Sequence, residues 1–140
     1  MDRDTLHSDL REDMNDPPKA NILVVDDFEE WRSQVRTILK VHPEWKIVAE
    51  ACDGPDAVQK ATELQPDIIL LDVGLPTLNG IATARIIRQK CPESRIIFLT
   101  QNQDREIMSE ALSIGCAGYV LKTKAATELL DAIEATLRNR

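Results

Sequence analysis

The sequence contains few of the residues on which metal and redox sites most often depend. Its 140 residues include two histidines, His7 and His42, and three cysteines, none of which forms a CxxC pair. Zinc sites and dithiol redox centres need clustered cysteine and histidine ligands, so the composition argues against both. An odd number of scattered cysteines is typical of reduced thiols, which predicts a cytoplasmic protein.

Net positive charge and long apolar runs are both absent from the sequence. The formal net charge is -7, which argues against direct binding of nucleic acid or of an anionic membrane surface. No apolar run approaches the ~20 residues that cross a bilayer, and the first residues lack the pattern of a signal peptide. The glycine-rich motifs of nucleotide enzymes are missing as well. We therefore expect partners that are proteins or cations.

The chain divides into two unequal parts. Residues 1–20 carry six acidic and three basic side chains and end near two adjacent prolines, a composition that buries little. We predict a disordered acidic tail there. Residues 21–140 have the length and apolar content of one compact domain.

Five short apolar runs alternate with segments of helical periodicity, which is typical of a doubly wound α/β fold with a parallel sheet. Because the runs are apolar throughout, helices should cover both faces of the sheet. Five βα units favour the flavodoxin-like strand order 2-1-3-4-5, in which strands 1 and 3 meet at the ligand-binding switch point. The runs are 21–25 (NILVV), 46–51 (KIVAEA), 67–72 (DIILLD), 95–100 (RIIFLT) and 118–122 (GYVLK).

Apolar side chains at helical spacing predict the buried side of each helix. We expect Phe28 to begin this stripe in the first helix, Leu64 to lie on it in the second and Leu112 in the fourth. The last helix is predicted to take Thr123 as its N-cap and to bury Ala126.

Aspartates follow two of the runs directly. Asp26 and Asp27 end the first run, and Asp72 ends the third. These strands are neighbours in the predicted order, about 4.8 Å apart, so the three carboxylates should converge. Crowded carboxylates repel one another, and an all-oxygen cluster suits Mg²⁺ or Mn²⁺. The sequence therefore predicts a site for a hard divalent cation.

A hydroxyl and an ammonium group should reach the same edge of the sheet, since Thr100 ends the fourth run and Lys122 the fifth. Together with a carboxylate nucleophile and a cation, these groups can take and hold a phosphoryl group. Each residue also has a structural explanation, because a strand-end Asp often caps a helix and a Lys usually faces solvent. Their joint occurrence at four strand ends favours the chemical interpretation.

The motifs VVDD, LLDVGLPTLNG, FLT and GYVLK are separated by 45 residues from Asp27 to Asp72, 28 to Thr100 and 22 to Lys122. In this order and spacing the sequence resembles the receiver domains of two-component response regulators, over about residues 20–138. The resemblance implies a CheY-like fold and a regulatory domain rather than an enzyme. It also implies phosphorylation by a sensor histidine kinase, a phosphotransfer protein or a small phosphodonor.

The resemblance implies a role for each matching acidic residue. Asp72 would be the phosphoacceptor. Asp27 and Asp72 would bind Mg²⁺ directly, joined by the backbone carbonyl of Gly74, while Asp26 would act mainly through water.

It likewise implies that Thr100 hydrogen-bonds the phosphoryl group and that Lys122 pairs with its charge. Tyr119 would be an aromatic switch that turns inward when Thr100 moves. A partly buried strand tyrosine with its hydroxyl in water explains Tyr119 equally well.

Three positions depart from the family pattern. Gln101 follows the switch threonine where a small residue is usual, and its bulk predicts slower phosphoryl transfer or hydrolysis. Gly74 lies where a side chain often borders the attacking water. Thr123 stands where many receivers have proline, and a cis Lys122–Thr123 peptide would cost about 2.5 to 4 kcal/mol.

The sequence leaves the output open. GCAGYVLKT and PTLNGIATARIIRQKCP most resemble receivers of NarL- and FixJ-type transcription factors, which predicts transcription regulation through a DNA-binding domain absent from this chain. The alternatives are a stand-alone receiver that acts through protein contacts and a receiver-like interaction module that is not phosphorylated. A homodimer through the C-terminal helices is a further expected partner. An aspartate-nucleophile phosphatase is disfavoured because Gly74 occupies the place of its second carboxylate.

Overall fold

The computed structural model describes residues 19–139, which form one five-stranded parallel sheet. The strand order β2-β1-β3-β4-β5 confirms the flavodoxin-like prediction. The predicted tail lies outside the described residues except for Lys19 and Ala20, and Ala20 already belongs to β1. The strands are β1 (Ala20–Val25), β2 (Trp45–Ala51), β3 (Ile68–Leu71), β4 (Arg95–Thr100) and β5 (Gly118–Leu121).

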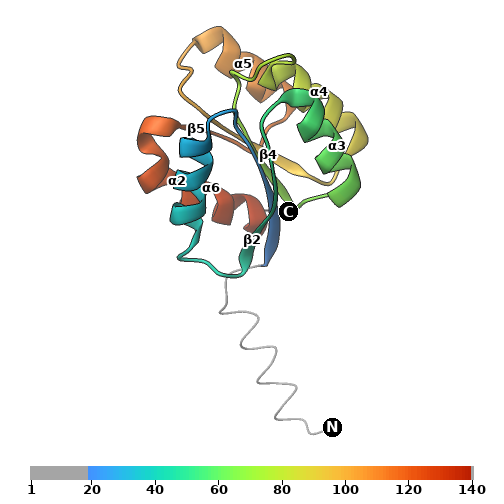
Figure 1. Ribbon diagram of the computed structural model, residues 1–140. Helices are drawn as coiled ribbons and strands as arrows, with labels where there is room; N and C mark the ends of the chain where they lie inside the picture. The colour runs from blue at the N-terminus through green and yellow to red at the C-terminus, as the bar shows by residue number, and fades with distance from the viewer. Residues whose placement is uncertain (1–18, 140) are drawn as a thin grey trace, which may run out of the picture.

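Helices cover both faces of the sheet, because nearly every residue of the central strands is apolar and buried (Figure 1). One face packs against α2 and α6, and the other against α3, α4 and α5. No helix within residues 19–139 has the length and apolar character needed to span a bilayer. The helices are α2 (Glu29–Leu39), α3 (Gly54–Leu64), α4 (Gly80–Lys90), α5 (Arg105–Ile114) and α6 (Ala125–Arg138).

Local capping signals fix several helix ends. The side chains of Asp53, Asn79 and Asp104 accept hydrogen bonds from the first turns of α3, α4 and α5. Gly115 ends α5 with a φ of 91°, the left-handed conformation that glycine adopts without steric cost. The three N-caps end the loops that leave the carboxyl ends of β2, β3 and β4, whereas Gly115 ends α5 before the chain enters β5.

Three side chains do not lie on the predicted buried stripes. Phe28 is the N-cap residue of α2 and its side chain is 57% exposed. Leu64 is the last residue of α3 and Leu112 lies beside the inward-facing Ala111, and both are exposed. Each of these helices has only about three turns, and over that length a buried stripe shifted by one residue fits the apolar pattern equally well.

The start of α6 also differs from the prediction. Thr123 is not its N-cap, because Lys122–Lys124 form a 3₁₀ turn that precedes the helix. The shift of register buries Ala125 and exposes Ala126. Peptide bonds are trans throughout residues 19–139, so the Lys122–Thr123 bond carries no cis strain.

The loop between β3 and α4 contains a strained threonine. Thr77 has a φ of 69°, and the amide of Leu78 donates to the carbonyl oxygen of Pro76 at 2.7 Å. The three residues form a γ-turn whose central residue is β-branched, a type that rarely adopts positive φ.

Replacing Thr77 with asparagine should therefore stabilise the fold by about 1 kcal/mol, because asparagine tolerates this conformation. Urea unfolding followed by circular dichroism measures the change. The same substitution at Thr62, a helical position with negative φ, should change the free energy by less than about 0.5 kcal/mol. Equal effects at both sites would contradict the strain.

Candidate functional site

The structure brings three carboxylates together at the carboxyl edge of the sheet. Asp26 and Asp27 follow β1, and Asp72 follows β3, which pairs directly with β1. One oxygen of each carboxylate lies within 4.8 Å of the others. Asp26 and Asp72 are buried, with 4% and 6% of their surface exposed, whereas Asp27 is exposed. The direct pairing of β1 with β3 in the 2-1-3-4-5 order thus creates the cluster.

Lys122 places its ammonium group beside two of these carboxylates. It is the first residue of the turn after β5 and is buried, with its ammonium 2.6 Å from Oδ2 of Asp26 and 3.2 Å from Oδ2 of Asp72. The Nζ atom also lies 4.9 Å from the centre of the Trp31 ring, within the range of a cation–π contact. Lys122 therefore offsets part of the repulsion between the two buried carboxylates.

Burial raises the pKa of Asp26, because water no longer stabilises the charged form. The hydrogen bond from Lys122 and the amide of Phe28, which donates to Oδ1 at 2.9 Å, work in the opposite direction. Both oxygens of Asp26 therefore already have donors, and a further positive charge nearby would favour its ionised form.

The main chain of Asn102 links Thr100 to Tyr119. Its amide donates to Oγ1 of Thr100 at 3.2 Å, and its carbonyl oxygen accepts from the Tyr119 hydroxyl at 2.8 Å. The Tyr119 hydroxyl is thus held by the protein rather than only by water. Burial, and next the negative charge of Asp72, raise the pKa of Tyr119. Thr100 and Tyr119 thus contact the two main-chain polar groups of one residue, so a movement of Thr100 would disturb the residue that accepts from Tyr119.

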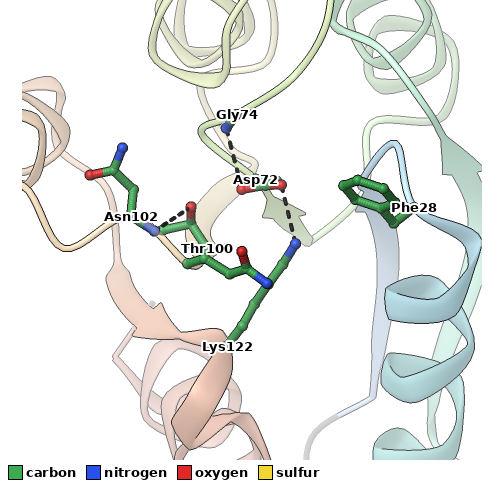
Figure 2. Close-up of a pocket in the computed structure, with 7 residues that line it drawn as sticks. Phe28, Asp72, Gly74, Thr100, Asn102 and Lys122 are labelled. Atoms are coloured by element: carbon green, nitrogen blue, oxygen red, sulfur yellow. Dashed lines mark hydrogen bonds and ion pairs between the residues drawn. The ribbon is translucent and has the colours of Figure 1, made fainter.

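An open pocket of about 310 Å³ gives access to Asp72 (Figure 2). The amide of Gly74 donates to Oδ1 of Asp72 at 3.3 Å, and a Cβ at Gly74 would have no atom within 4 Å. Glycine therefore keeps one side of the pocket open. The lining residues are Phe28, Asp72, Gly74, Thr100, Gln101, Asn102 and Lys122.

The arrangement of acids, hydroxyl and lysine matches a known family. The response regulator receiver domain family matches residues 22–134. The chain belongs to this family. A receiver is a regulatory domain, and the match covers every residue of the site described above.

Known relatives of this receiver are transcription regulators. It is 33% identical to the transcriptional regulatory protein DegU of Brevibacillus brevis over 116 residues, 83% of this chain and 49% of DegU. It is also 33% identical to the nitrate/nitrite response regulator NarL of Escherichia coli K12 over 120 residues, 86% of this chain and 56% of NarL. The receiver spans about half the length of these relatives.

Solved structures share the fold of this receiver. A LuxR-family two-component response regulator from Aurantimonas sp. has a TM-score of 0.82 and 36% identity, with 88% of each chain covered. The isolated REC domain of RcsB from Salmonella enterica, solved with the phosphomimetic BeF3-, has a TM-score of 0.83 and 25% identity. That match covers 88% of this chain and 91% of the RcsB domain.

The donor set of the receiver fits a hard divalent cation. The cluster offers carboxylate oxygens, which Mg²⁺ and Mn²⁺ prefer, and no histidine or cysteine takes part in it. Asp27 is exposed and Asp72 faces the pocket, whereas Asp26 is held by Lys122 and by the amide of Phe28. Both oxygens of Asp72 also accept hydrogen bonds, but at 3.2 and 3.3 Å rather than the 2.6 and 2.9 Å found at Asp26, so Asp27 and Asp72 are the better placed direct ligands.

Sequence reasoning missed three neighbours of the site. Phe28 was expected to pack inside, although it lines the pocket, and Trp31 was given no role at the site, although its ring centre lies 4.9 Å from the Nζ of Lys122. Asn102 acts through its main chain, so its side-chain type gives no signal. Its place two residues after Thr100 was the only available clue.

Proposed function

We propose that this receiver accepts a phosphoryl group on Asp72 in a reaction that depends on Mg²⁺. The main support for the proposal is the position of Asp72. Its carboxylate lines the pocket, lies 3.2 Å from the buried ammonium of Lys122, and has the carboxylates of Asp26 and Asp27 beside it. A carboxylate so placed can attack phosphorus while fixed positive charge offsets the charge of the incoming group. The donor is a sensor histidine kinase, a phosphotransfer protein or a small phosphodonor.

The direct ligands of the cation are Asp27, Asp72 and the carbonyl oxygen of Gly74, while Asp26 acts through water. When bound, Mg²⁺ supplies positive charge for the oxygens of the phosphoryl group. Lys122 keeps Asp72 oriented before transfer through its contact with Oδ2. After transfer it pairs with the phosphoryl charge.

The switch uses the connection through Asn102. When Thr100 turns to hydrogen-bond the phosphoryl group, its Oγ1 leaves the amide of Asn102. The carbonyl of the same residue holds the Tyr119 hydroxyl, so the change reaches β5 and the adjoining surface of α5. This coupling supports Tyr119 as the switch aromatic.

We propose that the output is control of transcription, through a DNA-binding domain outside this chain. We also propose that the regulator is cytoplasmic. DegU is a transcriptional regulatory protein by name, NarL is a nitrate/nitrite response regulator, and RcsB of Salmonella enterica has been solved bound to the promoter rprA. A homodimer through the C-terminal helices would provide the symmetry that paired DNA sites require. A stand-alone receiver and an interaction module that is not phosphorylated are the alternatives.

The test is Mg²⁺-dependent incorporation of phosphate from acetyl phosphate. We expect an adduct that is stable in acid and labile in base, formed by the wild type and by Asp67→Asn but not by Asp72→Ala. Asp67 lies at the opposite end of the same strand and is the matched control. Equal incorporation by wild type and Asp72→Ala would refute Asp72 as the acceptor, and no incorporation by either would favour the interaction module.

Replacing Gln101 with alanine should speed the decay of the phosphorylated protein. Gln101 lines the pocket, and its bulk screens the phosphoryl group from water. We expect an increase of a few fold, measured as the first-order loss of labelled phosphate from wild type and Gln101→Ala. Gln103→Ala, two residues further along the loop, is the control. Equal decay of the wild type and Gln101→Ala would refute the screening role.

A further inference from the structure

Phe28 is an exposed aromatic ring at the rim of the phosphorylation pocket. Its side chain is 57% exposed, and the other large hydrophobic side chains exposed within residues 19–139 are aliphatic. Phe28 lines the pocket together with Asp72, whereas those aliphatic residues lie elsewhere. The exposed phenyl ring is therefore apolar surface beside the reacting carboxylate that a phosphodonor can contact.

The main chain holds Phe28 in a fixed position. Its amide donates to Oδ1 of Asp26 at 2.9 Å, and its carbonyl oxygen accepts from the amides of Trp31 at 3.1 Å and Arg32 at 3.2 Å. Arg32 in turn donates to the carbonyl oxygen of Asp26 at 2.5 Å. The ring therefore stands on a rigid support, which lowers the entropy lost when a ligand binds against it.

The ring lies at the edge of the pocket through which a phosphodonor reaches Asp72. Figure 2 shows Phe28 and Asn102 on opposite sides of Asp72, with Lys122 reaching Asp72 from below. In phosphoryl transfer the attacking and leaving atoms lie roughly in line with phosphorus, so the leaving group lies on the far side of phosphorus from Asp72, within the pocket that Phe28 lines. Phe28 is the aromatic residue among those that line this pocket.

We infer that Phe28 is a stacking platform for flat aromatic leaving groups, and that it makes the receiver select phosphodonors of the phosphoimidazole class. The inference rests on the proposed function, since it assumes transfer to Asp72. An offset-stacked or edge-to-face ring pair contributes about 0.5 to 1.5 kcal/mol beyond the area that it buries. A donor whose leaving group has no ring gains nothing from this contact.

The transfer balances as a simple displacement. An oxygen of the Asp72 carboxylate forms a bond to phosphorus, and the bond between phosphorus and the imidazole nitrogen breaks. Imidazole leaves with the electron pair of that bond and takes up one proton from solvent. The ring lies against Phe28 while this bond breaks, and the acyl phosphate remains on Asp72.

The experiment compares two small donors that share a P–N bond, N-phosphoimidazole and phosphoramidate, of which only the first has a ring. The quantity is the ratio of their second-order rate constants for labelling Asp72. We expect Phe28→Ala to lower this ratio by about twofold to tenfold. Phe28→Tyr should keep it, and Phe28→Leu should lower it because leucine is apolar but not flat. Leu112→Ala, an exposed leucine remote from this pocket, is the control.

The outcomes separate this inference from the function on which it rests. If Phe28→Ala is labelled on Asp72 by both donors with the wild-type ratio, the proposed function stands and the stacking role is overturned. A wild-type ratio in Phe28→Leu would also overturn it, because the contact would then be merely apolar. If wild type is labelled by neither donor nor by acetyl phosphate, both proposals fail together.

Discussion

Replacing Gly80 with alanine should lower the free energy of unfolding by about 3 kcal/mol or more, in the upper range for forcing an atom into a packed site. A Cβ at Gly80 would lie 2.1 Å from the carbonyl oxygen of Asp72 and 2.6 Å from the Cα of Val73. Both neighbours are main-chain atoms, so no side chain can rotate away. The amide of Gly80 also donates to the carbonyl oxygen of Val73 at 2.7 Å, which keeps the two segments together.

Helix propensity acts in the opposite direction. Gly80 is the first residue of α4, and alanine is favoured over glycine inside a helix by about 1 kcal/mol at most. The steric conflict is larger, so the net change remains destabilising. Because the atoms in conflict belong to Asp72 and Val73, any relaxation would also displace the candidate phosphoacceptor.

Gly74→Ala is the matched control for this prediction. A Cβ at Gly74 would have no atom within 4 Å, so the free energy of unfolding should change by less than about 0.5 kcal/mol. Urea unfolding monitored by circular dichroism measures both variants. Equal urea midpoints of unfolding for Gly80→Ala and Gly74→Ala would contradict the prediction, because the close approach of Gly80 to the main chain of Asp72 and Val73 would then not limit stability.

The fold was predictable because its strands are short, apolar throughout and separated by helical periodicity. The strand order then determines which run ends are neighbours, and so it predicts that Asp26, Asp27 and Asp72 lie together. Lys122 and Thr100 followed from the same rule, since all parallel strands end at one edge.

The details that sequence could not supply depend on contacts of the main chain or on one residue of helical register. Asn102 joins Thr100 to Tyr119 through its peptide groups, which every residue type except proline possesses. Phe28 fits a helical stripe as well as it fits an N-cap, and only the position of the first turn of α2 decides between them.

Replacing Lys122 with methionine should lower the free energy of unfolding by about 3 kcal/mol in the absence of divalent cations, because removing one partner leaves buried charge uncompensated. The ammonium is shared by Asp26 at 2.6 Å and Asp72 at 3.2 Å, and all three side chains are buried. Methionine retains most of the apolar stem, so the change reports mainly the lost charge. Lys124→Met, an exposed lysine two residues further, is the control.

Mg²⁺ should recover more stability in Lys122→Met than in the wild type. A ligand that binds only the folded state stabilises it according to its concentration relative to its dissociation constant. The cation and the ammonium serve the same carboxylates, so the cluster should bind Mg²⁺ more tightly when Lys122 is gone. Urea unfolding in EDTA and in saturating Mg²⁺ measures this difference. Equal gains in both proteins would contradict a shared site.

The pH dependence of the Lys122→Met deficit provides an independent check. Burial raises the pKa of Asp26 above 3.8 in the folded protein, so folding takes up a proton in the window between 3.8 and the raised value. Stability contributed by this group therefore increases as the pH falls through that window.

Without Lys122, the hydrogen bond that opposes this shift is lost, so the window widens. The deficit relative to wild type should shrink as the pH is lowered, because a protonated Asp26 no longer needs the ammonium. A deficit that stays constant would mean that methionine disturbs packing rather than charge.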